Sequence, residues 1–419
     1  MTVRHFLSAA ALCLALAACE KKTSVASHPG PGAAPPGAIA DARALLASGE
    51  AALRQGDAET AVRAFRAAAE ADPRSVAAWA RWHEALRGLK RGDEARREFE
   101  KRLAAAPDDP VWLTLAALAD RNGREDRLRS AIRNAPDFAW AHCALCETLI
   151  DLKRYDEALR AADRAILLDP KNGVFRLQKA VALMWLGQSQ DALAEADRAA
   201  ESLPGDERVP IVRAQILMGD DRVDEAIAEM EKAAKLAPLA QAPKDVLRDW
   251  RLSAARRSLK EFDEAFREGR FGNAADASQR AAGILELVVR ESPADEVAAR
   301  LLPDAETASA GALLQRASAS LREGKDDEAQ SFCERATPWL ERAGGRKLDQ
   351  GSREYLTEGW IRLGALQLSL GDRLKEKGSA KAKDRFKAAL TAFESCIAAD
   401  PGNKTAAAMA AEARKALGP

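Results

Sequence analysis

Apolar and polar positions alternate with helical spacing along most of the chain, and residues 139–170 show the pattern most simply. One segment places leucines three and four residues apart: Leu145, Leu149 and Leu152. After Lys153–Arg154, a second segment places alanines on one helix face: Ala158, Ala162 and Ala165. Because small residues at this spacing let two helices approach closely, and Pro170 ends the second helix, the stretch predicts one antiparallel helix pair.

Prolines mark where such pairs end, and they recur at a fixed interval. Pro73 and Pro107 are 34 residues apart. The same interval of 34 residues separates each of Pro136, Pro170, Pro204 and Pro238 from the next. Only the step from Pro107 to Pro136, at 29 residues, is shorter. A period of this length indicates a repeat array, in which each helix pair buries its apolar face against its neighbours. Such arrays present an extended binding surface rather than a catalytic pocket.

The repeated residues resemble the tetratricopeptide repeat family. The shared pattern is a small residue on the first helix, an alanine that opens the second, a bulky residue, a small residue and a proline. It reads Gly49, Ala61, Phe65, Ala68 and Pro73 in the first unit, and Cys146, Ala158, Ala162, Ala165 and Pro170 in the fourth. The resemblance implies an all-α fold, a right-handed α-solenoid of about eight to nine antiparallel helix pairs.

The pattern predicts two segments, six repeats over residues 41–238 and degenerate helical repeats over residues 239–417. In the second segment we expect a long helix over 245–268, a turn at Phe271–Asn273 and an insertion over 374–383. The alanine-rich end, 404–417, predicts a capping helix. Divergent repeats are the favoured interpretation, and a separately packed helical subdomain is the alternative. No strand pattern or nucleotide-binding glycine motif is found.

The first residues predict export and lipidation. The apolar run Phe6–Ala18 is shorter than the roughly 20 residues that span a bilayer and has the length of a signal-peptide core. It ends in Leu16–Cys19, which resembles the lipobox of bacterial lipoproteins. That resemblance implies a signal peptide over 1–18, acylation of Cys19, a flexible Pro/Gly tether over 19–40 and a membrane-anchored protein facing the periplasm. Glu20 favours the outer over the inner membrane, and an ordinary cleaved signal is the alternative.

Charge and composition exclude several function classes. Lys+Arg and Asp+Glu both number 64, and this net charge of zero argues against a nucleic-acid binder. After removal of the signal, the only histidines are His28, His83 and His142, and no catalytic motif is present. The pair Cys143 and Cys146 lacks the second ligand pair of a structural zinc site. We therefore expect no enzyme, no metal and no cofactor, while a disulfide between these cysteines stays open.

In the tetratricopeptide repeat family, ligands lie along the first helices of the pairs. The resemblance carries these positions to a predicted groove, which comprises Trp140, Cys143, Glu147, Ile150, Val174, Leu177, Val181, Met184, Trp185, Ile211, Gln215 and Met218. The fifth unit is apolar at every such position, which is typical of a binding surface. Plain packing is the alternative, because Arg176 and Lys179 occupy core positions of the repeat and suggest a rotated helix. In the first two units the lining is charged, and we interpret it as a solvated face that comprises Arg43, Glu50, Arg54, Glu84 and Arg87.

These features predict a lipid-anchored scaffold or adaptor that binds another envelope protein through the predicted groove. One alternative is a protein that binds an envelope polymer, peptidoglycan or exopolysaccharide, along the same solenoid. Another is an enzyme with a site in the degenerate half. A polymer would favour a polar, aromatic-lined groove, whereas the fifth unit is aliphatic.

Overall fold

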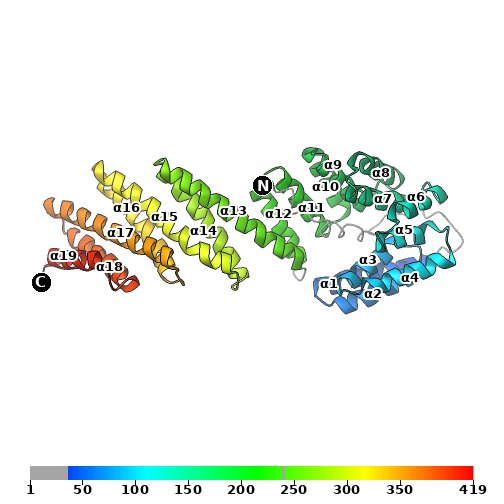
Figure 1. Ribbon diagram of the computed structural model, residues 1–419, viewed down its shortest axis with the longest axis horizontal. Helices are drawn as coiled ribbons and strands as arrows, with labels where there is room; N and C mark the ends of the chain where they lie inside the picture. Colours follow the sequence, from blue (N-terminus) through cyan, green and yellow to red (C-terminus); the bar gives the residue numbers. More distant parts are fainter. Residues whose placement is uncertain (1–35, 238–240, 419) are drawn as a thin grey trace. The chain divides into compact units, whose positions relative to one another are not determined.

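A computed structural model describes residues 36–237 and 241–418, and every regular element in these ranges is an α-helix (Figure 1). Nineteen helices follow one another and no strand occurs in either range, which confirms the all-α solenoid fold class. The expected signal peptide and Cys19 lie outside the described residues. The first helix begins at Pro36, so residues 36–40 of the expected tether are helical. None of the described helices is long and apolar enough to span a membrane.

The chain divides into two compact units, residues 1–247 and 248–419. The helices of the first unit form six consecutive pairs: α1 (Pro36–Arg54) with α2 (Ala58–Ala71), α3 (Val76–Gly88) with α4 (Gly92–Ala105), α5 (Pro110–Ala119) with α6 (Arg124–Asn134), α7 (Ala139–Asp151) with α8 (Tyr155–Leu168), α9 (Gly173–Trp185) with α10 (Ser189–Ser202), and α11 (Arg208–Gly219) with α12 (Val223–Leu236). The pair α7–α8 confirms the prediction for residues 139–170.

One left-handed residue makes the turn inside each pair of the first unit, and these residues follow the proline period. They are Gly56, Lys90, Gly123, Lys153, Gly187 and Asp221. Left-handed backbone costs an ordinary residue roughly 1 kcal/mol, and Lys90, Lys153 and Asp221 adopt it without the freedom of glycine. The turn geometry is therefore fixed by the packing of the two helices and not by local preference alone.

Small residues on the first helix of a pair receive bulky residues of the second. The Cα of Gly49 on α1 faces the ring of Phe65 on α2 so closely that an added Cβ would lie 2.4 Å from Phe65 Cε1. On α8, Ala158, Ala162 and Ala165 are all buried in one core cluster together with Cys146 of α7. The predicted core positions of the repeats are thus confirmed.

The second unit is built from longer helices. They are α13 (Gln241–Arg267), which begins in the first unit, α14 (Phe271–Glu291), α15 (Glu296–Arg322), α16 (Asp326–Gly344), α17 (Gln350–Glu376), α18 (Ala382–Ala399) and α19 (Lys404–Leu417). Three of them reach 27 residues, against 10 to 14 for α2–α12 in the first unit. This extra length accounts for the loss of the proline period after Pro238.

One local prediction for the second unit is wrong, and a second one is too long. The turn between α13 and α14 is made by Gly269, with φ of 72°, and Phe271–Asn273 lies inside α14. Phe271 is helical because its ring packs against Phe266 at 5.2 Å. The expected insertion over 374–383 is shorter in the structure, because residues 374–376 end α17 and residues 382–383 begin α18, and only residues 377–381, with Gly378 in the left-handed conformation, connect the two helices. The terminal helix is confirmed as α19.

Candidate partner-binding surfaces

The predicted groove residues lie on the first helices α7, α9 and α11 of consecutive pairs, and most of them are covered. The buried ones are Cys143, Glu147, Ile150, Val174, Leu177, Val181, Ile211 and Gln215. The partly exposed ones are Trp140, Met184, Trp185 and Met218. In this arrangement a partner can therefore contact the last four directly.

The fifth repeat contributes its apolar residues to the largest core cluster of the first unit. Val174, Leu177 and Val181 are at most 1% exposed. Trp185 is stacked on Tyr155 at 5.7 Å, and its buried indole Nε1 has no hydrogen-bond partner among the described residues. These contacts give each of these side chains a packing role.

Arg176 and Lys179 lie on another face of α9, between α8 and α10. Arg176 Nη1 is 3.2 Å from Glu195, and Lys179 Nζ is 2.9 Å from Asp163 and 3.5 Å from Glu195. Burial opposes the charge of Lys179, but the hydrogen bond to Asp163 and the nearby carboxylates raise its pKa overall. Ion pairs therefore stabilise cations at these repeat positions.

A buried arginine organises the charged residues of the first two repeats. Arg81, 3% exposed, donates from Nε to Glu50 at 2.6 Å and from Nη1 to Glu84 at 2.8 Å. Burial would lower the pKa of Arg81, but Glu84 and Glu50 outweigh it and raise the pKa. The prediction of a solvated face is therefore wrong for Glu50 and Glu84, which are partly buried partners of this arginine.

The same network reaches across the repeats to α11. Arg208 is buried and pairs with Asp206, whose pKa its guanidinium lowers although burial acts in the opposite direction. Glu84 on α3 has a raised pKa because its burial outweighs the fields of Arg81 and Arg208. Charges of the second and sixth repeats therefore act on one another inside the first unit.

A second buried cluster joins α5, α6 and α7. Arg124 donates to the carbonyl of Ala117 at 2.9 Å and to Asp151 at 3.3 Å, and it lies 3.9 Å from Glu147. Burial raises the pKa of Glu147 to about 7 despite Arg124, and the Oε2 atom of Glu147 has no hydrogen-bond partner in the part of the chain that is described. Burial, together with Arg87 and Arg124, lowers the pKa of His83 to about 4.

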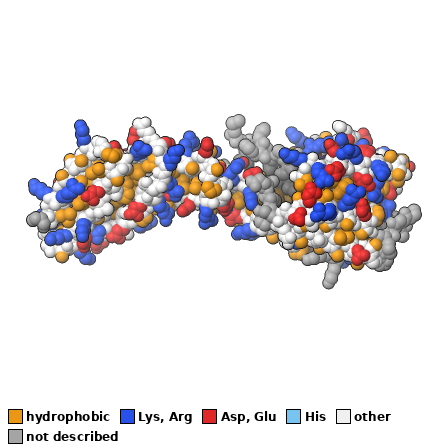
Figure 2. All heavy atoms as spheres, turned by 90° about the horizontal axis from the view of Figure 1, so that it is seen from below, with side chains coloured by type: hydrophobic (Ala, Val, Ile, Leu, Met, Phe, Trp, Pro, Cys, Tyr) orange, Lys and Arg blue, Asp and Glu red, His pale blue; other side chains and the backbone are white. Residues whose placement is uncertain are grey.

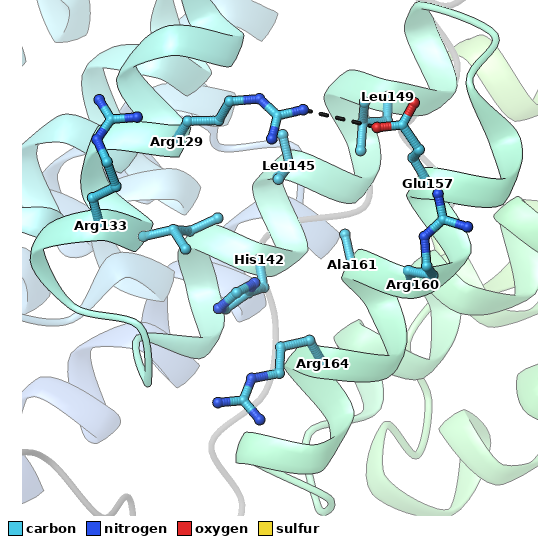
Figure 3. Close-up of a pocket in the computed structure, with 10 residues that line it drawn as sticks. Arg129, Arg133, His142, Leu145, Leu149, Glu157, Arg160, Ala161 and Arg164 are labelled. Atoms are coloured by element: carbon cyan, nitrogen blue, oxygen red, sulfur yellow. Dashed lines mark ion pairs between the residues drawn. The ribbon is translucent and has the colours of Figure 1, made fainter.

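A groove that the sequence did not predict opens on the first unit between the second helices α6 and α8 (Figure 3). The cavity measures about 400 Å³ and α7 forms its floor with His142, Leu145 and Leu149. Cationic side chains border it: Arg129, Arg133, Arg160 and Arg164. Its floor residues lie on the face of α7 opposite to the predicted groove positions Cys143, Glu147 and Ile150.

The same space is filled in other repeats. Trp79 and Trp82 fill it above α3, where both are at most 2% exposed and lie edge to face at 5.6 Å. The ion pairs of Arg176 and Lys179 fill it above α9. Above α7 the corresponding residues are the smaller His142 and Leu145, and the neighbouring pair is shortened, since α5 has 10 residues and α6 has 11. The short repeat and the missing tryptophans together leave the groove open.

Arginine charges at this groove are only partly balanced. At one end Arg129, Arg154, Glu125 and Glu157 form a neutral cluster, with Arg154–Glu157 at 2.6 Å and Arg129–Glu157 at 3.8 Å. In the described part of the chain, Arg133, Arg160 and Arg164 form no ion pair with a carboxylate. Burial, together with Arg164, lowers the pKa of His142, whose Nε2–H donates to the carbonyl of Pro136 at 3.0 Å. The groove therefore carries an excess of positive charge over an apolar floor.

The cysteines are inert in this fold. Cys143, Cys146, Cys333 and Cys396 are buried free thiols, so the disulfide left open by the sequence is not formed between Cys143 and Cys146. Burial raises the pKa of all four and keeps them protonated, to about 12 for Cys333 and about 11 for Cys396. Over 36–237 and 241–418 no group of His, Cys, Asp and Glu could hold a metal ion.

Across both units, Lys and Arg side chains are interspersed with Asp and Glu on the face that Figure 2 shows. This mixed surface agrees with the net charge of zero.

The groove arginines could not be recognised from the sequence, because outward-facing charges on amphipathic helices are usually solvated. The signal that could have found them is the 29-residue proline step next to arginines spaced four residues apart on two helices.

Comparison with known proteins supports tetratricopeptide repeats in the first unit, where the family profile matches residues 52–119 and 149–216. With the helix pairs described above, these matches define a TPR-like α-solenoid. No curated protein matches the chain by sequence.

Three solved structures illustrate the likeness. A thermophilic TPR protein of Thermus thermophilus is 22% identical, over 41% of this chain and 95% of that one, with a TM-score of 0.38. A tetratricopeptide repeat protein of Parabacteroides merdae is 16% identical over 63% and 98%, with a TM-score of 0.35. PilF of Pseudomonas aeruginosa is 18% identical over 50% and 98%, with a TM-score of 0.30. At these identities the likeness concerns the fold alone.

Proposed function

We propose that the chain is a lipid-anchored scaffold. It holds another envelope protein against the first helices of the pairs in its first unit, among them α7, α9 and α11. The observation that carries the proposal is the array of helix pairs itself, because stacked repeats of this kind offer a long surface made by successive first helices. TPR proteins are in general protein-interaction scaffolds, and the partner here is a protein of the cell envelope.

The anchoring part of the proposal is supported by the N-terminal sequence. The apolar run Phe6–Ala18 ends at Cys19 in the lipobox-like Leu16–Cys19. Several acyl chains on one cysteine hold a protein at a membrane where a single chain does not. The solenoid would then face the periplasm, at the outer rather than the inner membrane.

Fractionation of cells tests the anchor. Cys19→Ala should move the protein from the membrane to the soluble fraction, whereas Cys13→Ala, inside the apolar run, should leave it at the membrane. Membrane association of the Cys19→Ala chain to the same extent as the parent would refute the anchor.

Photo-crosslinking in intact cells tests the protein-binding surface. A photoreactive phenylalanine analogue replaces Met184 or Met218, which are partly exposed on α9 and α11, and a matched control replaces the exposed Glu201 on α10. We expect a discrete adduct with one envelope protein from both methionine positions and none from Glu201. Adducts of equal yield from all three positions, or none from the methionines, would contradict the proposal.

A further inference from the structure

The groove between α6 and α8 has no part in the proposed function, and its chemistry is specific. Its floor is formed by Leu145 and Leu149 of α7, which are 7% and 2% exposed, and the partly exposed Ile132 of α6 adds apolar surface that an occupant can reach. Its borders carry Arg133, Arg160 and Arg164, none of which forms an ion pair in the described part of the chain, although Glu157, whose pKa is lowered chiefly by its hydrogen bond with Arg154, also lies in the field of Arg160. An occupant that complements this surface is apolar on one side and anionic on its edges.

The spacing of the cations adds a geometric requirement. Arg129 and Arg133 lie one helical turn apart on α6, and Arg160 and Arg164 lie one turn apart on α8 (Figure 3). Residues at i and i+4 on a helix are about 5–6 Å apart at their Cβ atoms. Carboxylates at positions i and i+4 on a docked helix are the same distance apart. Leu145 and Leu149 on the floor are also spaced i and i+4.

We propose that this groove binds a short acidic amphipathic helix of a partner protein. The apolar stripe of that helix packs on Ile132 and on the part of Leu145 that is exposed, and its carboxylates pair with Arg133, Arg160 and Arg164. Helix-in-groove recognition of this type uses apolar anchors at i, i+3 and i+4. The neutral cluster of Arg129 with Glu125, Glu157 and Arg154 closes one end of the groove and fixes where the helix stops.

A peptide fits this surface better than a phosphate polymer does. Nucleic acids bind through many phosphate contacts along a basic stripe. Here the cations are confined to one groove, and the carboxylate of Glu157 lines the same groove. The apolar floor would contribute nothing to a sugar-phosphate backbone, whereas it removes leucine side chains from water.

Fluorescence anisotropy with the full mature chain in detergent tests the proposal. The probe is a labelled synthetic helix of about 15 residues, with glutamates at i and i+4 and leucines on the opposite face. A control peptide carries lysines in place of the glutamates. Arg160→Ala with Arg164→Ala removes the cations of α8, and Arg256→Ala with Arg290→Ala removes two exposed arginines of the second unit as a matched control.

A second variant acts without removing an arginine. His142→Trp places on the floor the residue that fills the corresponding space above α3, Trp79. Because His142 is partly exposed at the surface, the variant should fold, and an unchanged thermal midpoint checks this.

We expect the acidic peptide to bind, the Arg160/Arg164 variant and His142→Trp each to weaken binding at least fivefold, and the Arg256/Arg290 control to bind as the parent does. Equal binding by all variants would overturn the proposal. Groove-dependent binding of single-stranded DNA or of anionic phospholipid vesicles, without binding of the peptide, would also overturn it. These results are independent of the crosslinks from Met184 and Met218, which test the opposite face of the first helices.

Discussion

Ionisation of Glu147 should lower the free energy of unfolding of the first unit at neutral and alkaline pH. Glu147→Gln should remove this loss of stability. The side chain is 3% exposed on α7, its Oε2 atom is unpaired among the described residues, and Arg124 is no closer than 3.9 Å. Burial therefore raises the pKa to about 7 from its ordinary value of 4.5. The folded chain binds a proton between these values that the unfolded chain has already lost, so the free energy of unfolding falls as the pH rises through this window.

The magnitude follows from the size of the shift. Each pKa unit corresponds to about 1.4 kcal/mol, so the loss between about pH 4.5 and pH 7 approaches 3 kcal/mol. Glutamine keeps the shape of the protonated acid and carries no charge, while Asp151 stays 3.3 Å from Arg124. At pH 8 the variant should be more stable by up to about 3 kcal/mol, or roughly 6–12 °C in thermal midpoint for a unit of this size.

Thermal unfolding followed by circular dichroism and calorimetry between pH 5 and pH 8 measures this difference. The variant is compared with the parent at each pH, because the lowered pKa of His83 makes stability rise with pH in both chains and cancels in the difference. The gain should be small at pH 5 and largest at pH 8. A gain that is independent of pH, or a less stable variant at pH 8, would show that Glu147 is ionised in the folded chain and refute the reasoning.

Three further predictions concern packing, ion pairs and thiols. Gly364→Ala places a Cβ 2.5 Å from the buried ring of Phe393 and should destabilise the second unit by about 1–3 kcal/mol in denaturant titrations. The control Gly283→Ala has open space around its Cβ and should raise the free energy of unfolding by up to about 1 kcal/mol. Equal effects of the two substitutions would contradict the close approach of Gly364 to Phe393. Arg81→Met leaves Glu50 and Glu84 without their cation and should lower the free energy of unfolding by about 3–5 kcal/mol. Arg96→Ala, which breaks an exposed pair with Asp93, should lower it by less than about 0.5 kcal/mol. A loss below about 1 kcal/mol for Arg81→Met would exclude a buried network. Iodoacetamide at pH 8 should leave Cys143, Cys146, Cys333 and Cys396 unmodified in the native chain and label all four after denaturation; rapid native labelling of Cys143 or Cys146, seen by mass spectrometry, would disprove their inert burial.

Proline spacing allowed the helices of the first unit to be predicted because each proline marks the end of a pair and the spacing fixes the register. The turn beside Gly269 could not be placed in the same way. Phe271–Asn273 has the composition of a loop, but the contact of Phe271 with Phe266 favours the helix. Tertiary packing overrode a local preference at this position.

The groove between α6 and α8 could not be predicted, because it arises where α7 carries smaller side chains than the tryptophans at the corresponding positions of α3. His142 and Leu145 are unremarkable on a helix, and only comparison with Trp79 and Trp82 on α3 shows that space is left unfilled. The burial of Val174, Leu177 and Val181 was equally hidden, since an apolar position on a first helix reads the same whether neighbouring chain covers it or not. Sequence patterns identify which face a residue occupies, and side-chain volumes decide what remains accessible.

The reach of Arg208 toward Arg81 and Glu84 has a consequence for how the first unit comes apart. Repeat arrays in which each module touches only its neighbours fray from their ends, one module at a time. Here the sixth repeat carries a buried charge that acts on the second, so detachment of α11 changes the electrostatic environment of α3. Loss of the Arg208 charge should therefore raise the pKa of Glu84 further, so that a titrating group on α3 reports on the state of α11.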